Sequence, residues 1–322
     1  MKRFTPCILL GVLPTSGVCL ADNPPIDSSK NEKVAATLQP ASTEPAKPIK
    51  QERTLLKLPF KFGLDYYTGV SNIPGERHFS DGLWAGSVTA APSLAYMSWT
   101  DGSGTNMRLS AGIGGMFTGS GSALNQPAEA YWQRESGRMA VTVGKFWVPF
   151  GAQEWSYESK PGVMLQWKSG KNAVAFASNY NTDTHRANNY LHFSRTVGAE
   201  SNIGVSLAGG KGLTYNSLHD AAIGVDATTL LSGFRFSGEY IGALHGNQGF
   251  NFGYGKVSCE RLGLWKPYVG VYSWADRSGA FGQFQSAVYG MQYQVNALMG
   301  IDAGVAPTAS SKRWWIQLHT SM

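Results

Sequence analysis

Short segments in which apolar and polar residues alternate strictly restrict the fold of this chain more than any other feature of its sequence. In the segment 60–67, four apolar or aromatic side chains from Phe60 to Tyr66 alternate with a second set that includes Lys61 and Asp65. A period of two places the two sets on opposite faces of a β-strand. The pattern therefore predicts strands that have one apolar and one mainly polar face.

Many other segments show the same period. Segments with clear alternation begin at Phe60, Asn106, Arg138, Val163, Ala173, Ile203, Phe234, Phe250, Ala287 and Arg313. Weaker candidates lie near Leu94, Ala130, Leu191, Ala221, Val269 and Ile301. No window has the pattern of a long amphipathic helix, so we expect an all-β fold in a single domain.

A soluble β-sandwich or barrel would also alternate, but three features favour a barrel that spans a membrane. The polar faces consist mainly of Gly, Ser, Asn and Gln, as expected for a wet lumen. Charged residues make up 15% of the chain, against roughly 25% in soluble domains. Aromatic rings that suit membrane interfaces recur at segment ends: Trp99, Trp132, Trp147, Trp167, Trp265, Trp274 and Trp314. The predicted fold is a transmembrane antiparallel up-and-down β-barrel, apolar toward lipid, so Phe250 and Phe252 should face outward.

The first residues of the chain predict export. Residues 1–21 have a basic start and an apolar stretch too short to cross a bilayer as a helix, which indicates a cleaved signal peptide. An acylated Cys19 is the alternative, but Val18 is bulky for the position before it. Residues 22–54 contain five prolines and no aromatic residue, and predict a disordered periplasmic tail. Residues 55–322 hold 38 of the 39 aromatic residues and are assigned to an outer-membrane barrel.

The length of the barrel region bounds the number of strands. Strands of roughly ten residues with their connections allow 12 to 16 strands, and we expect 12 or 14. The predicted long loops are Ser71 to Gly82, Phe150 to Gly162, Gly209 to His219 and Asp276 to Phe284. The segment Arg313 to Thr320 has the pattern of a closing strand. The chain ends in Met322, whereas outer-membrane barrels commonly end in an aromatic residue.

One short motif carries a family resemblance. The stretch Val143-Gly144-Lys145-Phe146-Trp147-Val148-Pro149-Phe150-Gly151 resembles a motif of the porin superfamily that includes the phosphate-selective porins. Pro149 lacks an N–H and so ends a strand ladder, while Gly151 allows the chain to turn. The resemblance covers about ten residues, and it implies a porin-like barrel and, among porins, a trimer. It does not imply phosphate selectivity, because the chain lacks a dense basic ladder.

Charged side chains on the polar faces are the candidates for lining a pore. They are Lys61, Asp65, Arg108, Glu129, Lys168, Arg235 and Glu239. Residues 55–322 contain 20 Lys and Arg against 16 Asp and Glu, a mild excess that gives no support to a nucleic-acid partner and hints at anion preference. We expect no nucleic-acid partner. The alternative is that the basic side chains pair with the acidic ones and do not select ions. Lys145 shares its parity with apolar residues and would snorkel at a headgroup boundary.

Signals for catalysis and for bound groups are weak. His192 and Ser194 lie two apart on one strand face, as in lipid hydrolases of the outer membrane, but that face should be the lumenal one, away from lipid. Cys259 is the single cysteine after residue 21, which excludes a cysteine-based metal site, and the histidines lack metal-ligand spacing. We therefore expect no enzymatic activity, no metal and no cofactor.

These observations together predict an outer-membrane channel for the passive diffusion of small hydrophilic solutes or ions, with membrane lipid around it and a weak preference for anions. The alternative is a narrow or plugged barrel with a structural or adhesive role. A lipid-modifying enzyme is a third possibility, and it would require His192 and Ser194 on the lipid side with a polar partner.

Overall fold

A computed structural model describes residues 60–72, 78–79, 93–113, 127–152, 159–213, 220–246, 248–277, 283–307 and 312–322 of the protein. The predicted signal peptide and tail lie outside these residues and remain predictions. The described strands are β1 Phe60–Ser71, β2 His78–Phe79, β3 Leu94–Thr100, β4 Thr105–Gly112, β5 Pro127–Ser136, β6 Met139–Trp147, β7 Ser159–Ser169, β8 Asn172–Asn181, β9 Arg186–Gly198, β10 Ser201–Gly209, β11 Ala221–Leu231, β12 Phe234–His245, β13 Gln248–Cys259, β14 Trp265–Asp276, β15 Gln283–Asn296, β16 Met299–Pro307 and β17 Lys312–Ser321.

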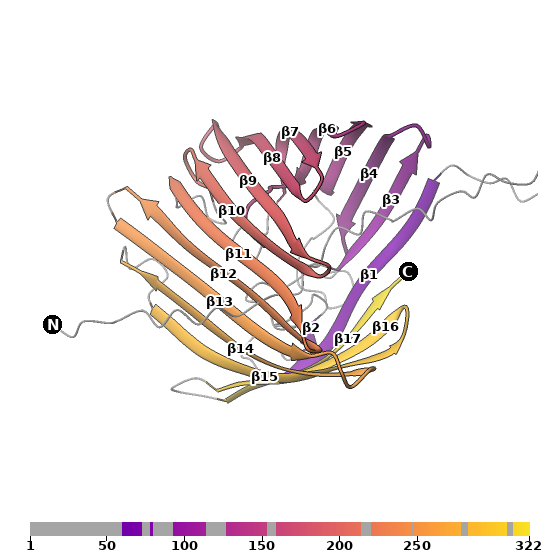
Figure 1. Ribbon diagram of the computed structural model, residues 1–322, viewed down its shortest axis with the longest axis vertical. Helices are drawn as coiled ribbons and strands as arrows, with labels where there is room; N and C mark the ends of the chain where they lie inside the picture. Colours follow the sequence, from indigo (N-terminus) through magenta and orange to yellow (C-terminus); the bar gives the residue numbers. More distant parts are fainter. Residues whose placement is uncertain are drawn as a thin grey trace, which may run out of the picture. The chain divides into compact units, whose positions relative to one another are not determined.

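The strands form one closed antiparallel barrel (Figure 1). From β3 onward each strand pairs with the next along the chain, and β1 pairs with both β3 and β17. The two-residue strand β2 pairs with the second half of β1, beyond the stretch that β3 covers. β2 and β3 pair with different parts of β1 and so occupy the same place in the barrel wall, which leaves sixteen strand positions around the wall. The prediction of a transmembrane antiparallel barrel is confirmed.

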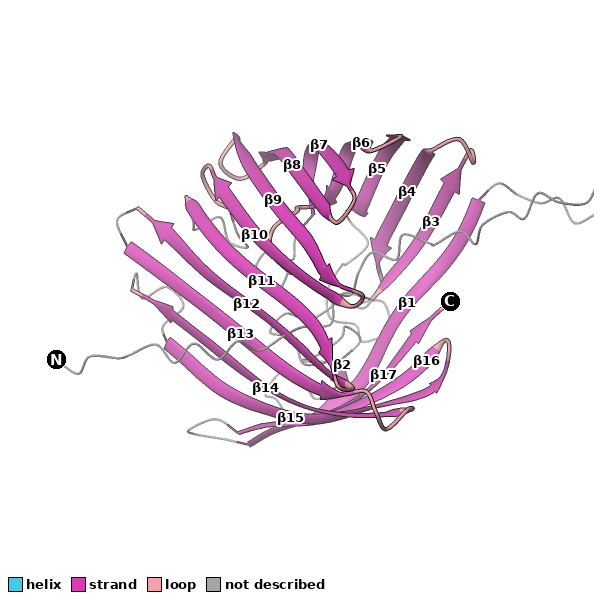
Figure 2. Ribbon diagram, viewed as in Figure 1, coloured by secondary structure: helices cyan, strands magenta, loops and turns pink. Residues whose placement is uncertain are grey.

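The sixteen positions fall within the predicted range of 12 to 16 strands, but the narrower expectation of 12 or 14 was too low. Every weakly alternating segment forms a strand of the wall, from β3 at Leu94 to β16 at Ile301 (Figure 2). These segments alternate poorly because Gly, Ala and Thr occupy many of their positions, as in β11, which reads AAIGVDATTLL. Small residues carry little hydrophobic contrast between the two faces, so the pattern underestimates the number of strands.

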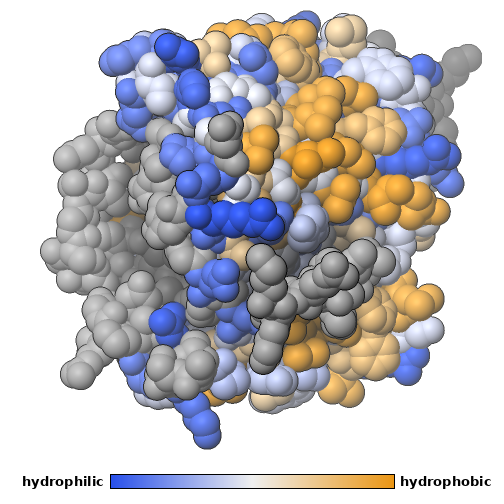
Figure 3. Space-filling model, turned by 90° about the vertical axis from the view of Figure 1, so that its left-hand side faces the viewer, coloured by the Kyte–Doolittle hydropathy of each residue, from blue (hydrophilic) through white to orange (hydrophobic). Residues whose placement is uncertain are grey.

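The outer face of the wall is apolar. Phe62 is 69% exposed and Ile223 is 54% exposed, and similar side chains follow every second position around the barrel. Figure 3 shows a contiguous patch of such side chains on one side of the wall. Among the described residues, no helix is long and apolar enough to cross a membrane.

Two predicted orientations were wrong. Phe250 and Phe252 were expected on the outer face, but both are buried and pair with the buried Ala243 and Ile241 of β12. Trp274 pairs with Phe252 and therefore also faces inward rather than toward a membrane interface. The inner face of this part of the wall is itself aromatic and packed, so apolarity does not identify the lipid side there.

The two ends of the barrel differ in the length of their connections. At one end, here called the short-turn end, the strands are joined by segments 101–104, 137–138, 170–171, 199–200, 232–233, 260–264 and 297–298. At the other, the long-connection end, lie the segments 72–93, 113–126, 148–158 and 210–220. The four predicted long loops lie largely outside the described residues and remain predictions, except that Ser159 to Gly162, predicted as loop, belong to β7. In outer-membrane barrels the short turns face the periplasm.

Candidate functional site

The chain that follows β6 turns into the interior of the barrel. Val148 and Phe150 have 0% exposure, although they lie beyond the end of the strand. The N–H of Phe150 donates to the carbonyl oxygen of Val148 across Pro149, at 3.0 Å, and Gly151 then takes a φ of +56°. A left-handed residue at this position redirects the backbone, and glycine adopts that conformation without steric cost.

This inward segment, residues 148–152, is anchored on the far side of the wall. The N–H of Gly151 donates to Ser206 Oγ of β10 at 2.7 Å, and the N–H of Ala152 donates to Glu239 Oε1 of β12 at 3.1 Å. Neither β10 nor β12 is a neighbour of β6 in the wall. The segment therefore crosses the interior, and two side chains of the opposite wall satisfy its backbone donors.

A second segment, residues 210–213 after β10, bends against the inner face of β7 to β9. The Gly212 carbonyl oxygen accepts from Lys160 Nζ at 3.1 Å, from Asn181 Nδ2 at 2.7 Å and from Asn188 Nδ2 at 3.0 Å. The hydroxyl of Tyr190 donates to the carbonyl of the fully buried Leu213 at 3.0 Å. Polar side chains of three neighbouring strands thus hold this segment inside the barrel.

His192 lies beside the anchor of the inward segment. Its Nδ1 is 2.8 Å from Ser206 Oγ and 3.9 Å from Asp226 Oδ2 of β11. A Ser–His–Asp hydrolase needs the serine and the carboxylate at opposite ring nitrogens, whereas here both approach the same one. The structure pairs His192 with Ser206 and not with the predicted Ser194, and the geometry fits an anchoring group rather than a catalytic one.

Two of the candidate pore-lining residues form an ion pair on the inner face of β4 and β5. Arg108 Nε lies 2.7 Å from Glu129 Oε2, which also accepts from Ser110 Oγ at 3.0 Å. The Arg108 guanidinium stacks over the ring of Tyr96 at 4.3 Å. The alternative in which lumenal charges neutralise each other therefore describes this pair.

Arg235 belongs to an ion-pair network at the short-turn end. It lies 3.0 Å from Glu200 and 3.3 Å from Glu260, and Glu260 also pairs with Lys266 at 2.9 Å. Glu239, the other candidate on the inner face of β12, accepts from the N–H of Ala152. Partial burial raises the pKa of Glu260, but the hydrogen bonds and charges of Lys266 and Arg235 outweigh it, and the net pKa lies below the usual range.

Replacing Glu260 by glutamine should destabilise the barrel in a pH-dependent way. Because the folded-state pKa is lowered, the stabilisation by the carboxylate is complete above the unfolded value near 4.5 and is lost as the pH falls through the folded-state pKa. We expect Glu260→Gln to lower the free energy of unfolding by about 1 kcal/mol at pH 7. Urea unfolding in lipid vesicles at pH 7 and at pH 3.5 measures the difference, which should shrink at the lower pH. An equal loss of unfolding free energy at both pH values would contradict a stabilising role of the Glu260 carboxylate.

The remaining pore-lining candidates, Asp65, Lys61 and Lys168, also lie on the inner face of the wall. Asp65 Oδ1 is 3.6 Å from His319 Nε2, whose ring stacks on Tyr67 where β1 meets β17. Lys61 and Lys168 are exposed and have no ion-pair partner among the described residues. These two lysines are therefore the unneutralised cations of the candidate set. No group of three or more His, Cys, Asp or Glu residues suited to a metal occurs within the described ranges.

Comparisons with known proteins identify the fold. Neither protein-family models nor curated proteins match this sequence. An anion-selective porin from Comamonas acidovorans superposes with a TM-score of 0.62 at 11% identity, covering 81% of this chain and 98% of that one. The trimer form of OmpT, an outer membrane protein of Vibrio cholerae, gives 0.60 at 10% identity over 82% and 99%. A variant of the Rh. blastica porin gives 0.58 at 9% identity over 82% and 100%. The protein therefore shares the barrel fold of these three solved structures.

Proposed function

We propose that the protein is an outer-membrane channel through which small hydrophilic solutes diffuse passively. The observation that carries this proposal is the sixteen-position wall, because barrels of this size enclose more space than their own side chains fill. The inward segments 148–152 and 210–213 would narrow the lumen on two sides, and this narrowing would require no conformational change. Diffusion through such a lumen requires no cofactor.

Ion preference in this channel would rest on few charges. Arg108 and Arg235 are paired with carboxylates, so within the candidate set Lys61 and Lys168 are the cations that would favour anions. Glu239 and Asp226 lie near the inward segment and oppose them, which supports a weak rather than a strong preference.

Single-channel recording in a planar bilayer tests the proposal. The refolded protein should give discrete conductance steps, and a salt gradient should give a reversal potential that favours anions. The double variant Lys61→Gln/Lys168→Gln should move the permeability ratio toward the cation side, because no carboxylate among the described residues neutralises these charges. Arg108→Gln/Glu129→Gln is the matched control, since it removes one charge of each sign.

A folded barrel that shows no conductance would contradict the channel and leave the structural or adhesive alternative.

We also propose that the protein assembles as a homotrimer, supported by the trimer form of the OmpT structure, which resembles this fold. Light scattering of the refolded protein in detergent measures the assembly state, and a monomeric mass would contradict this part of the proposal.

A further inference from the structure

Four basic side chains lie together on the outside of the short-turn end. They are Arg134 near the end of β5, Arg138 and Lys171 in the next two short turns, and Arg195 near the end of β9, and all four are exposed. We call them the basic rim. The turns touch one another: the N–H of Lys168 donates to the Arg138 carbonyl, and the N–H of Thr196 donates to the Lys171 carbonyl, both at 2.8 Å. The four charges therefore follow one continuous arc of the barrel.

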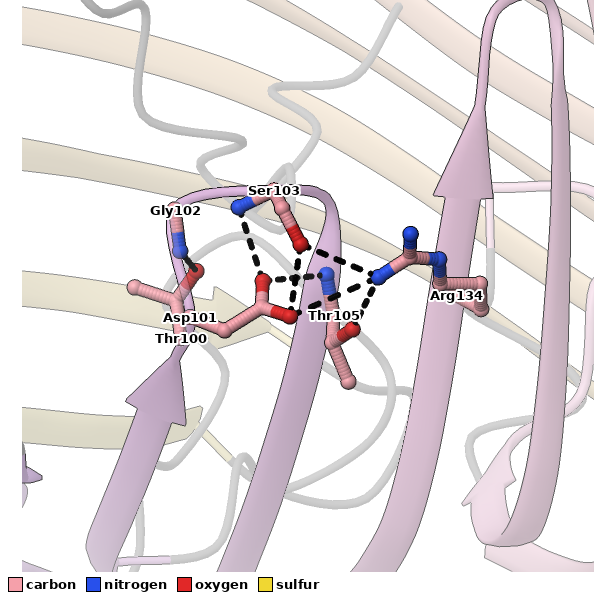
Figure 4. Close-up of polar contacts among 6 residues, drawn as sticks. All are labelled: Thr100, Asp101, Gly102, Ser103, Thr105 and Arg134. Atoms are coloured by element: carbon pink, nitrogen blue, oxygen red, sulfur yellow. Dashed lines mark hydrogen bonds and ion pairs between the residues drawn. The ribbon is translucent and has the colours of Figure 1, made fainter.

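The side chain of Arg134 is held in place by the neighbouring turn (Figure 4). Its Nη1 contacts Asp101 Oδ2 at 3.4 Å, Ser103 Oγ at 3.1 Å and the hydroxyl of Thr105. Hydrogen bonds from Ser103 and Thr105 hold the pKa of Asp101 below its usual range, so the carboxylate stays charged. All three acceptors meet one nitrogen, and the rest of the guanidinium makes no hydrogen bond to the described residues. A guanidinium group that is held in place and keeps free N–H donors is suited to bind an oxyanion.

The basic rim lies directly beyond the apolar belt of the outer face. Arg134 follows Trp132 by two residues, and Arg195 follows Phe193 by two, so each pair shares the outer face of its strand. Trp132 and Phe193 are each 40% exposed on that face. Aromatic rings mark the boundary of the hydrocarbon region, and the next position along the strand is at the level of the lipid headgroups.

Three acidic residues lie near the basic rim, Asp101, Glu135 and Glu200, and Glu135 shares the inward face of β5 with Tyr131 and Gln133. Asp101 is engaged by Arg134, and Glu200 is engaged by Arg235 on the inner side. Arg195 and Lys171 have no ion-pair partner within the part of the chain that the structure describes. Of the short turns across the barrel, 232–233 and 297–298 carry no charged residue, and 260–264 carries one acid and one base, Glu260 and Arg261. A group of four basic side chains on neighbouring strands and turns is therefore a feature of the β5 to β9 sector.

We propose that the basic rim binds the headgroups of anionic phospholipids in the membrane leaflet at the short-turn end. Phosphate oxygens of neighbouring headgroups along the arc would accept from the free donors of Arg134 and from Arg138, Lys171 and Arg195, while the acyl chains lie along the apolar face near Trp132. The inference depends on membrane insertion of the barrel and not on conduction. A barrel that binds these lipids without conducting would separate it from the proposed function.

The test is native mass spectrometry of the refolded full chain with equal amounts of phosphatidylglycerol and phosphatidylcholine that carry the same acyl chains. A basic residue at a membrane surface favours an anionic lipid by about fivefold. We therefore expect the protein to retain phosphatidylglycerol at least about fivefold over phosphatidylcholine. The variant with Arg134, Arg138, Lys171 and Arg195 all replaced by glutamine should reduce this preference to within about twofold.

The control variant replaces four basic residues of the long-connection end, Lys145, Arg186, Arg277 and Lys312, by glutamine, and it should keep the preference. If the four-residue variant fails to fold, Lys171→Gln/Arg195→Gln still tests the proposal, because these side chains make no hydrogen bond or ion pair among the described residues. A preference lost equally in both four-residue variants would overturn the assignment to the basic rim. So would the absence of any preference in the unmodified protein.

Discussion

Replacing Gly144 by alanine should prevent the barrel from folding stably. Gly144 has a φ of +127°, which L-residues avoid, and a Cβ there would overlap the carbonyl oxygen of Ala130 and lie 2.8 Å from Tyr131 Cα. Both obstacles are backbone atoms of β5, so no side chain can rotate away to relieve them. Backbone strain and overpacking together should cost more than about 3 kcal/mol. Urea unfolding in vesicles and the heat-dependent shift in gel mobility measure the loss.

Gly249 provides the matched control for this prediction. It lies in β13, a hypothetical Cβ there meets nothing within 4 Å, and its φ is not in the left-handed region. Gly249→Ala should therefore leave the unfolding midpoint nearly unchanged. If Gly144→Ala folds as well as Gly249→Ala, β5 and β6 are not paired as described.

Removal of both anchors of the inward segment should enlarge the conductance of the channel. Ser206→Ala/Glu239→Ala deletes the acceptors for the N–H groups of Gly151 and Ala152. Each lost hydrogen bond costs about 1 kcal/mol, so the pair shifts the docked segment toward undocking by roughly thirtyfold. Single-channel recordings should show a larger step, or flicker between two levels, because the narrowing relaxes.

Glu239→Gln separates anchoring from charge in this experiment. A glutamine keeps a side-chain oxygen that can accept from Ala152, but it removes the negative charge near His192 and Asp226. Its ion preference should move toward anions while its conductance stays close to that of the unmodified protein. A large conductance increase in Glu239→Gln, or none in the double alanine variant, would show that these bonds do not hold the segment.

Local sequence predicted the faces of the wall wherever one face is clearly apolar. In β12, Phe234 and Arg235 identify the outer and inner faces, because lipid and water on the two sides select opposite residue types. The rule failed in β13, where Phe250 and Phe252 pack inward against Ile241 and Ala243. Alternation shows that two faces differ, and it does not show which of them meets lipid when the interior is itself filled with aromatic rings.

The contacts of the candidate site were beyond prediction for a different reason. Ser206 appears in the sequence as one polar residue of an alternating strand, and nothing local indicates that it receives the N–H of Gly151, 55 positions away. Likewise Arg235 meets Glu200 only because β9 to β12 are consecutive in the wall. Such pairs depend on registers between strands, which the pattern along one strand does not encode.

The pairing of β1 with β17 has a consequence for how this protein is made. Asp65 pairs with Ser321 and Ser71 pairs with Trp315, so the first strand meets its second neighbour only after the last strand exists. Until then, both edge strands carry a row of unpaired N–H and C=O groups that would readily pair with other chains. Contacts this distant in sequence also form slowly. A truncation of only the last ten residues should therefore leave an open, aggregation-prone sheet rather than a slightly smaller pore, and biogenesis must protect both edges until synthesis is complete.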